Sequence, residues 1–194
     1  MLDQRLETLR RAAERAGIPV IASLNGVSRA GWTDFASQLE QAGAAAIEPN
    51  VFRIPADLSE DGPHIDRECV EVLRAVKASV RIPVSVKLSP FHSSTGHFAL
   101  QLVQAGADGL ALFNRFYEPD IDLATLQPQP DFDLSTPADV RLGLTWMSLL
   151  HGHLGSTSLA ATSGVWSGDD VVKYLLTGAD VVMSTSALLR HGPQ

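Results

Sequence analysis

The sequence has little of several features that would assign it to a specialised class of protein. It contains a single cysteine, Cys69, so no disulfide can form within the chain, and this fits a reducing compartment such as the cytoplasm. No apolar run approaches the roughly 18 residues that a membrane span needs. The segment from Met1 to Arg5 has no apolar stretch, so we expect neither a secretory leader nor a membrane partner.

Positive charge is also scarce. The chain has 15 Lys and Arg residues against 22 Asp and Glu residues, which gives a formal net charge of −7, and it has no basic cluster. Nucleic acid is therefore not an expected partner, because binding its phosphate backbone requires a basic surface. We expect a small-molecule ligand instead.

The composition that remains is typical of a globular protein, and 194 residues are enough for one domain spanning residues 1–194. Short apolar runs alternate with helical patterns. The runs do not alternate polar with apolar residues, which is typical of strands buried on both faces of a parallel sheet. The runs lie at 19–24, 45–49, 82–88, 108–113, 158–162 and 180–184, and the helical patterns at 2–16, 32–42, 65–79, 94–105, 137–151 and 168–177.

A Gly-Ala pair recurs between these elements. Gly43, Gly106 and Gly178 each end a helical pattern, and the alanine that follows opens an apolar run. A glycine at a helix C-terminus followed at once by a buried strand is the short loop of repeated β/α units. Two longer segments, 51–64 and 115–136, follow strands, and in β/α folds the loops after strands build the active site.

Two α/β architectures fit this pattern. A closed (β/α)₈ TIM barrel needs eight strands and typically about 250 residues, whereas six strands are expected here. We favour an incomplete TIM barrel of about six parallel strands. An open, doubly wound parallel sheet is the alternative.

Polar or small residues stand where the predicted strands end. Because the carboxyl ends of parallel strands lie on one side of a sheet, we expect these residues to lie close together at one opening of the fold. They are Asn50, Lys87, Asn114, Thr162, Ser163, Gly164, Thr185 and Ser186.

Lys87 is the most informative of these residues, because a lysine in an apolar strand must find a partner or give up its charge. Three interpretations stay open. Lys87 is a structural residue in a core ion pair or reaching to solvent, a Schiff-base nucleophile, or a cation facing an anionic or electron-rich ligand. In the last case Asn50 and Asn114 would be fixed donors and acceptors around a planar polar ligand.

Small residues follow the last two predicted strands, at Ser163-Gly164 and at Thr185-Ser186. Such turns offer backbone N–H groups and hydroxyls to an anion, and the loops after the last two strands of a barrel are its usual phosphate site. The same residues are also ordinary components of a tight β/α loop, so both interpretations stand.

Four stretches of the sequence carry a resemblance to a known family. They are 18–26 (IPVIASLNG), 86–90 (VKLSP), 112–117 (LFNRFY) with 119–122 (PDID), and 178–183 (GADVVM) with 187–193 (ALLRHGP). Through them the chain resembles the FMN-binding dihydroorotate dehydrogenases, and most closely their dihydroorotate dehydrogenase-like branch. The resemblance implies an eight-stranded barrel of which this chain has the third to eighth strands, with no counterpart of the first two.

The resemblance also implies FMN as the cofactor and a role for each matching residue. Lys87 would contact the flavin ring, and Asn50 and Asn114 would lie between flavin and substrate. The turn at 162–164 and the turn at 185–186 would hold the FMN phosphate.

One residue departs from the family pattern. Family members have a cysteine or serine three residues after the asparagine that Asn50 matches, and this residue takes the substrate proton. The present chain has Arg53 there, which is a poor base because it stays protonated. Arg53 is therefore a candidate for holding a substrate carboxylate, or else a solvated loop residue.

The leading hypothesis is an FMN-dependent oxidoreductase that oxidises dihydroorotate to orotate in pyrimidine biosynthesis, or acts on a related substrate. Lys87 would then stabilise negative charge on the reduced flavin. Two alternatives remain: a flavin-free barrel lyase or aldolase with Lys87 as the Schiff base, and a truncated, non-catalytic chain. A six-strand arc would also expose two strand edges, so association, including a homo-oligomer, is expected.

Overall fold

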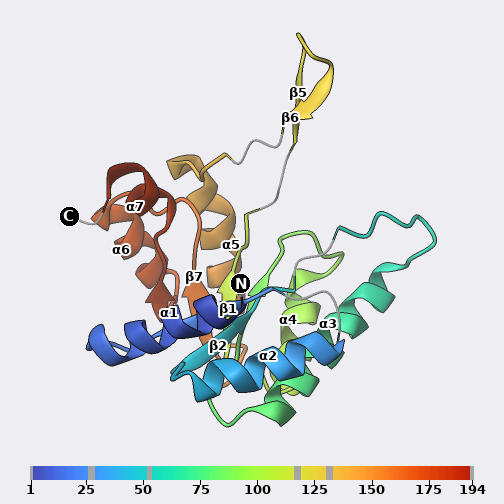
Figure 1. Ribbon diagram of the computed structural model, residues 1–194. Helices are drawn as coiled ribbons and strands as arrows, with labels where there is room; N and C mark the ends of the chain where they lie inside the picture. The colour runs from blue at the N-terminus through green and yellow to red at the C-terminus, as the bar shows by residue number, and fades with distance from the viewer. Residues whose placement is uncertain (1, 26–28, 52–53, 116–118, 130–132, 193–194) are drawn as a thin grey trace.

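The computed structural model describes residues 2–25, 29–51, 54–115, 119–129 and 133–192. Six parallel strands alternate with helices along the chain, as predicted (Figure 1). The strands are β1 (Ile21–Leu24), β2 (Ala46–Pro49), β3 (Ser85–Leu88), β4 (Gly109–Leu112), β7 (Ser158–Ala161) and β8 (Val181–Val182). The helices are α1 (Leu2–Arg15), α2 (Arg29–Gln41), α3 (Gly62–Ser79), α4 (Thr95–Gln104), α5 (Val140–Leu150), α6 (Gly168–Leu176) and α7 (Ser186–His191), with a 3₁₀ turn at Pro137–Asp139.

The strands lie side by side in the order in which they occur in the chain. Parallel ladders join β1 to β2, and β3 to β4, β7 and β8 in turn. β2 and β3 are joined by the pairs Ile47–Val84 and Asn50–Lys87. A doubly wound sheet reverses its strand order part-way, so this order rules out that alternative and gives the arrangement of a barrel. Among the described residues β1 and β8 each pair with one strand only, so the barrel is an open arc.

The short loops between helices and strands have the geometry that the Gly-Ala pairs predict. Gly43, Gly106 and Gly178 have φ angles of 96°, 98° and 98°. This is the left-handed region, which favours glycine because a Cβ is disfavoured there. Each of the three glycines follows the end of a helix and lets the chain turn at once into the next strand, which is largely buried for β2 and β4 and partly exposed for β8.

The strands place successive side chains on opposite sides of the arc. In β3, Val86 and Leu88 are buried in the main hydrophobic core together with Phe98 and Leu102 of α4. Lys87 lies between them in sequence and therefore faces the other side, which is the interior of the barrel. This alternation brings the polar residues of neighbouring strands into one space.

Two features were not predicted from the sequence. Residues 186–191 form the short helix α7 after the last strand. The second long segment contains an antiparallel hairpin of β5 (Asp120–Asp122) and β6 (Gln127–Gln129), which projects away from the rest of the molecule (Figure 1). No helix among the described residues is long and apolar enough to cross a membrane.

Candidate functional site

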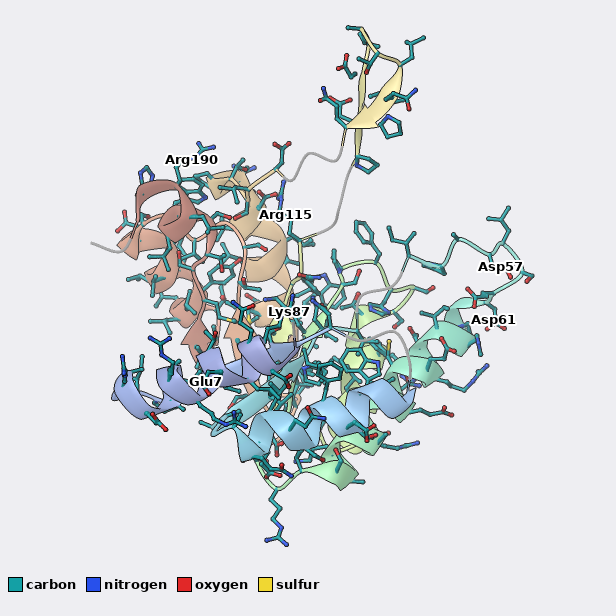
Figure 2. All side chains as sticks on the ribbon, in the orientation of Figure 1. Glu7, Asp57, Asp61, Lys87, Arg115 and Arg190 are labelled. Carbon is teal, nitrogen blue, oxygen red and sulfur yellow. The ribbon has the colours of Figure 1, made fainter. Side chains whose placement is uncertain are left out.

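Lys87 lies inside the arc with a carboxylate beside it. Its Nζ is 3.4 Å from Oε1 of Glu48, and the Glu48 side chain is only 7% exposed while that of Lys87 is 19% exposed. Figure 2 shows Lys87 near the centre of the molecule. The structural interpretation of Lys87 as a member of an ion pair therefore holds. The same side chain also lines a cavity, so the ion pair does not exclude a contact with a ligand.

The two asparagines meet next to Lys87. Nδ2 of Asn114 donates a hydrogen bond to Oδ1 of Asn50 at 3.1 Å. Their backbone N–H groups donate to the preceding strands, from Asn50 to Leu24 O at 2.8 Å and from Asn114 to Leu88 O at 2.7 Å. The ladder thus fixes both backbones. Each side-chain amide keeps further hydrogen-bonding capacity for a ligand, because the mutual bond uses one donor and one acceptor.

A cavity of about 140 Å³ opens at the strand ends, and we call it the mouth cavity. Six of the residues predicted for the site line it. They are Lys87, Asn114, Thr162, Ser163, Thr185 and Ser186. The other lining residues are Phe113, Arg115, Leu134, Ser135, Val165, Met183 and Leu189. The structure thus brings lysine, amide and hydroxyl groups from four strands into one space.

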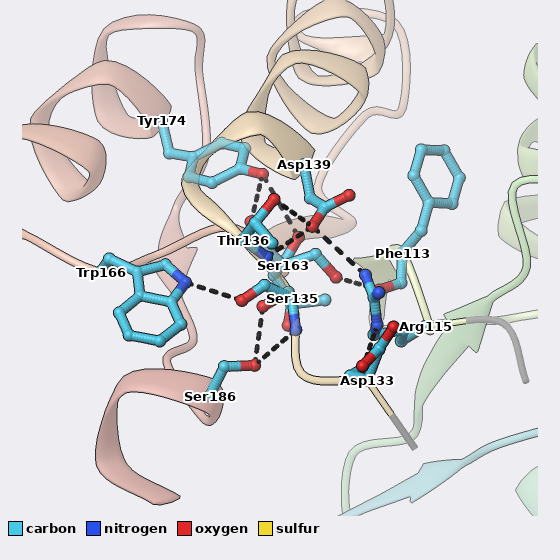
Figure 3. Close-up of polar contacts among 11 residues, drawn as sticks. Phe113, Arg115, Asp133, Ser135, Thr136, Asp139, Ser163, Trp166, Tyr174 and Ser186 are labelled. Carbon is cyan, nitrogen blue, oxygen red and sulfur yellow. Dashed lines mark hydrogen bonds and ion pairs between the residues drawn. The ribbon is translucent and has the colours of Figure 1, made fainter. Parts of the chain in front are cut away.

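The turn after β7 is held rigidly (Figure 3). Ser163 and Gly164 have φ angles of 77° and 73°, and a Cβ on Gly164 would overlap the backbone of Val140. Glycine at position 164 is therefore required by the close approach of the turn to α5. The turn is also held by the hydroxyl of Tyr174, which donates to the carbonyls of Thr162 at 3.3 Å and Ser163 at 2.9 Å.

Burial raises the pKa of Tyr174 to about 12, and the charges of Asp170 and Asp139 add to this effect. The hydroxyl therefore keeps its proton at any ordinary pH. This matters for the site because that proton holds the turn at Ser163 in place.

Residues 133–136 form a strap that is bonded to the start of α7. Ser135 N donates to Oγ of Ser186 at 3.0 Å, the two Oγ atoms lie 2.7 Å apart, and Nε1 of Trp166 donates to Ser135 O at 2.8 Å. The hydroxyl of Ser186 thus already has protein partners, as does that of Ser163, which donates to Phe113 O at 3.1 Å. The bond between the two serine hydroxyls uses one proton, so the other is available for an anion.

Arg115 supplies a second cation beside Asn114. Its Nη1 is 3.2 Å from Oδ2 of Asp139, and its Nε donates to Asp133 O. Arg53, in contrast, lies outside the described residues, so its predicted contact with a substrate carboxylate stays a prediction.

Glu48, Ser135 and Arg115 were not identified from the sequence. Glu48 carries a detectable signal, since it is a carboxylate in an apolar strand two residues before Asn50 and so on the same strand face. Arg115 directly follows Asn114. Ser135 precedes the pair Thr136-Pro137, which is a helix-start signal, and its second use as a partner of Ser186 depends on a long-range contact.

Among the described residues, no group of three or more His, Cys, Asp or Glu side chains is placed so that it could hold a metal ion. Cys69 is buried.

Comparison with known proteins identifies the family of barrel proteins to which the chain belongs. The sequence pattern of the family described as dihydroorotate dehydrogenase matches residues 1–194. The chain belongs to the dihydroorotate dehydrogenase family. It is therefore part of a TIM barrel and of a family of oxidoreductases.

Two curated relatives illustrate the similarity. Dihydroorotate dehydrogenase A (fumarate) of Lacticaseibacillus paracasei is 32% identical over 185 residues, which cover 91% of this chain and 62% of the relative. The catalytic subunit of dihydroorotate dehydrogenase B (NAD(+)) of Endomicrobium trichonymphae is 28% identical over 210 aligned positions, covering 98% of this chain and 62% of the relative. The chain thus spans about three fifths of the length of these relatives.

A solved structure has the same fold. The crystal structure of the dihydroorotate dehydrogenase of Eimeria tenella in complex with ferulenol superposes with a TM-score of 0.68 at 15% sequence identity, over 98% of this chain and 60% of that chain. At this identity the likeness shows the fold alone, and it agrees with the open arc described above.

Proposed function

We propose that the chain forms the cofactor-binding mouth of an FMN-dependent oxidoreductase that acts on dihydroorotate or a related cyclic acid. The observation that carries this proposal is the mouth cavity, in which a lysine, an amide and five hydroxyl side chains meet. A flavin mononucleotide needs donors of these kinds, because it joins a polar ring system to a phosphate ester. Membership of a dihydroorotate dehydrogenase family supports the substrate class.

The residues present fit FMN by their chemistry. Thr162, Ser163, Thr185 and Ser186 place hydroxyls at the end of the cavity formed by β7 and β8, which suits a phosphate. Lys87 and Asn114 come from β3 and the end of β4, which suits the ring. The cavity of about 140 Å³ is smaller than the 300 Å³ or more that is typical of a whole cofactor site, so the ring would extend toward the open side of the arc.

FMN would supply the acceptor for a hydride when it is bound. The chain's own residues would bind and orient. Lys87 would place its ammonium group against negative charge that develops on the ring, and Glu48 would fix the direction of that side chain. Asn50 and Asn114, locked to each other, would present their remaining amide groups to a planar substrate.

Flavin titration tests the proposal. The purified chain should bind FMN, followed by the quenching of flavin fluorescence, and Lys87→Ala should weaken binding by about tenfold or more because a charge-assisted contact is lost. Lys77→Ala is the matched control, since Lys77 pairs with Asp108 outside the mouth cavity at 2.6 Å. This variant should bind FMN as the parent does.

Two results would contradict the proposal. Equal FMN affinity of the parent and Lys87→Ala would remove Lys87 from the site. Absence of flavin binding, together with covalent trapping of a keto acid on Lys87 by borohydride, would favour the flavin-free lyase instead.

A further inference from the structure

One side chain, that of Arg115, holds both ends of the strap (Figure 3). At the first end, its Nε donates to the carbonyl oxygen of Asp133. At the other end, its Nη1 lies 3.2 Å from Oδ2 of Asp139, and the same oxygen accepts hydrogen bonds from Thr136 N at 2.6 Å and Thr136 Oγ1 at 3.1 Å. Arg115 and Asp133 are 18 positions apart, so this contact closes the base of the long segment that carries the β5–β6 hairpin.

The middle of the strap meets the hydroxyl turn after β8. Ser135 is only 5% exposed. Its N–H donates to Oγ of Ser186 at 3.0 Å, and its own Oγ lies 2.7 Å from the same atom. The direction in which the Ser186 hydroxyl points therefore depends on where the strap lies. That hydroxyl is one of the groups that we assign to the phosphate end of the mouth cavity.

We propose that Arg115 is a positioning residue, which clamps the strap and so orients the hydroxyl of Ser186 for a phosphate. The clamp would give the mouth cavity a higher affinity for a flavin that carries a phosphate than for the same ring without one. This inference deepens the proposed function and rests on it for the identity of the ligand. The clamp itself concerns only contacts within the chain.

Arginine is the side chain that suits such a clamp. Its planar guanidinium presents N–H donors in fixed and different directions, so it can bond two separate acceptors at once. Here the two acceptors are the Asp133 carbonyl and the Asp139 carboxylate. A lysine at this position would carry the same charge as a single ammonium group on a flexible stem, and it would not hold both ends together.

The clamp also starts from a fixed point of the barrel. Arg115 directly follows Asn114, whose backbone N–H donates to Leu88 O at 2.7 Å and whose side chain donates to Asn50 at 3.1 Å. The backbone that carries the guanidinium is therefore anchored to β3 and to the end of β2. Because the base is fixed, the position of the strap follows from the contacts of Arg115, and little further ordering is needed when a ligand binds.

Charge alone would give Arg115 a different role, and the two roles predict opposite effects at Asp139. Arg115 lines the mouth cavity, so its charge would also attract a phosphate through space. In that case, removal of the Asp139 carboxylate would leave the cation uncompensated and would tighten the binding of an anion. A clamp predicts weaker binding, because the strap loses its second anchor.

Titration with FMN and with riboflavin tests the clamp, since the two ligands share a ring system and differ by the phosphate. Arg115→Gln should raise the Kd of FMN by about tenfold and leave that of riboflavin within about twofold. Riboflavin binding also shows that the variant is folded. Arg115→Lys should recover little of the lost FMN affinity, and Asp139→Ala should weaken FMN binding as well.

Hydrogen exchange followed by mass spectrometry tests the clamp without any flavin. The N–H of Ser135 is bonded to Ser186, so peptides that cover the strap should exchange at least about tenfold faster in Arg115→Gln than in the parent. Arg141→Gln is the matched control, because it removes the same charge from an exposed side chain two positions after Asp139. It should keep the parent's exchange rates and its preference for FMN over riboflavin.

Four results would overturn the inference. They are unchanged exchange of the strap in Arg115→Gln, equal losses of FMN and riboflavin affinity in that variant, full recovery of FMN affinity by Arg115→Lys, and tighter FMN binding by Asp139→Ala. A parent chain that binds neither flavin would contradict the proposed function. The exchange rates of the strap would then decide by themselves whether Arg115 clamps it.

Discussion

At the scale of single residues, Lys87 and Glu48 form an ion pair at the mouth, with Nζ and Oε1 3.4 Å apart. Both groups are largely removed from water, and burial of a charge is tolerated where a partner compensates it. Removing one partner leaves the other charge uncompensated, whereas removing both leaves none. The pair is therefore expected to be strongly coupled.

A double-mutant cycle measures this coupling. Glu48→Gln keeps the shape of the side chain and should lower the free energy of unfolding by about 1–3 kcal/mol, as should Lys87→Ala. The double variant should be at least about 1 kcal/mol more stable than the sum of the two single effects implies. Urea denaturation gives the three values, and strict additivity would show that the two side chains do not interact.

The Tyr174 hydroxyl is a second single group on which the site depends. Tyr174→Phe should lower the free energy of unfolding by about 1–2 kcal/mol and weaken FMN binding, because two carbonyls of the turn lose their donor. Thr8→Val, which removes a hydroxyl bonded to Gln4 O on the exposed face of α1, is the control and should change both quantities little.

The pKa of Tyr174 gives this variant a pH signature. The folded pKa of about 12 lies above the ordinary value of 10.0, so the stabilisation is complete below pH 10 and is lost as the pH rises toward 12. The parent should therefore lose more stability than Tyr174→Phe between pH 9 and pH 11. Parallel curves for the two proteins would show that Tyr174 is not buried in solution.

At the scale of elements, the start of α6 holds the loop that carries Trp166. Asp170 and Ser167 form a capping box, and Asp170 Oδ2 also accepts from Trp166 N at 3.2 Å. Trp166 in turn donates to the strap at Ser135. One carboxylate thus supports a helix start, a loop and the strap that borders the mouth cavity.

Acid denaturation tests the role of Asp170. Its hydrogen bond from Lys173, together with those from Ser167 and Trp166, lowers its pKa from 3.8 to about 2 despite burial. This depression corresponds to about 2 kcal/mol of stability, present above pH 3.8 and lost as the pH falls toward 2. Asp170→Asn should remove it and flatten the thermal stability profile between pH 2 and pH 5. The neighbouring Asp169→Asn, at an exposed position, should keep the parent's profile.

The elements themselves were largely predictable from the sequence. Buried parallel strands such as β4 appear as continuous apolar runs, and the three Gly-Ala pairs fix the loops before β2, β4 and β8. The β5–β6 hairpin was not predictable in this way, because its strands are three residues long and consist of DID and QPQ. Local periodicity has no signal at that length.

The candidate site was predictable where it follows from strand ends and not where it depends on contacts between distant segments. Lys87 and Asn114 lie at strand ends, as do the hydroxyl residues of the turns after β7 and β8, which are Thr162, Ser163, Thr185 and Ser186. All of them line the mouth cavity. The bond of Ser135 to Ser186 joins residues 51 positions apart, and the partner of Lys87 lies 39 positions away. Pairings of that kind depend on how the strands are arranged, which no local pattern contains.

At the scale of the whole molecule, the arc exposes what a closed barrel would bury. Ile21 of β1 is 58% exposed and Val181 of β8 is 53% exposed, and these are the two strands of the arc that pair with a single neighbour among the described residues. Ala22 and Leu24, which alternate with Ile21, are buried, so the exposed side of β1 is the one that faces the barrel interior. Unpaired strand edges that carry exposed apolar side chains favour association with another chain.

Size-exclusion chromatography of the chain tests this last expectation. The parent should elute as an oligomer or as aggregate, and the double variant Ile21→Lys/Val181→Lys should shift toward the monomer, because a lysine at each edge opposes pairing with another chain. Leu123→Lys is the matched control. Leu123 is 85% exposed on the projecting hairpin, so this variant should elute as the parent does if association occurs through the strand edges. A parent chain that elutes as a monodisperse monomer and holds one FMN per chain would show that the arc is closed in solution by the chain's own residues.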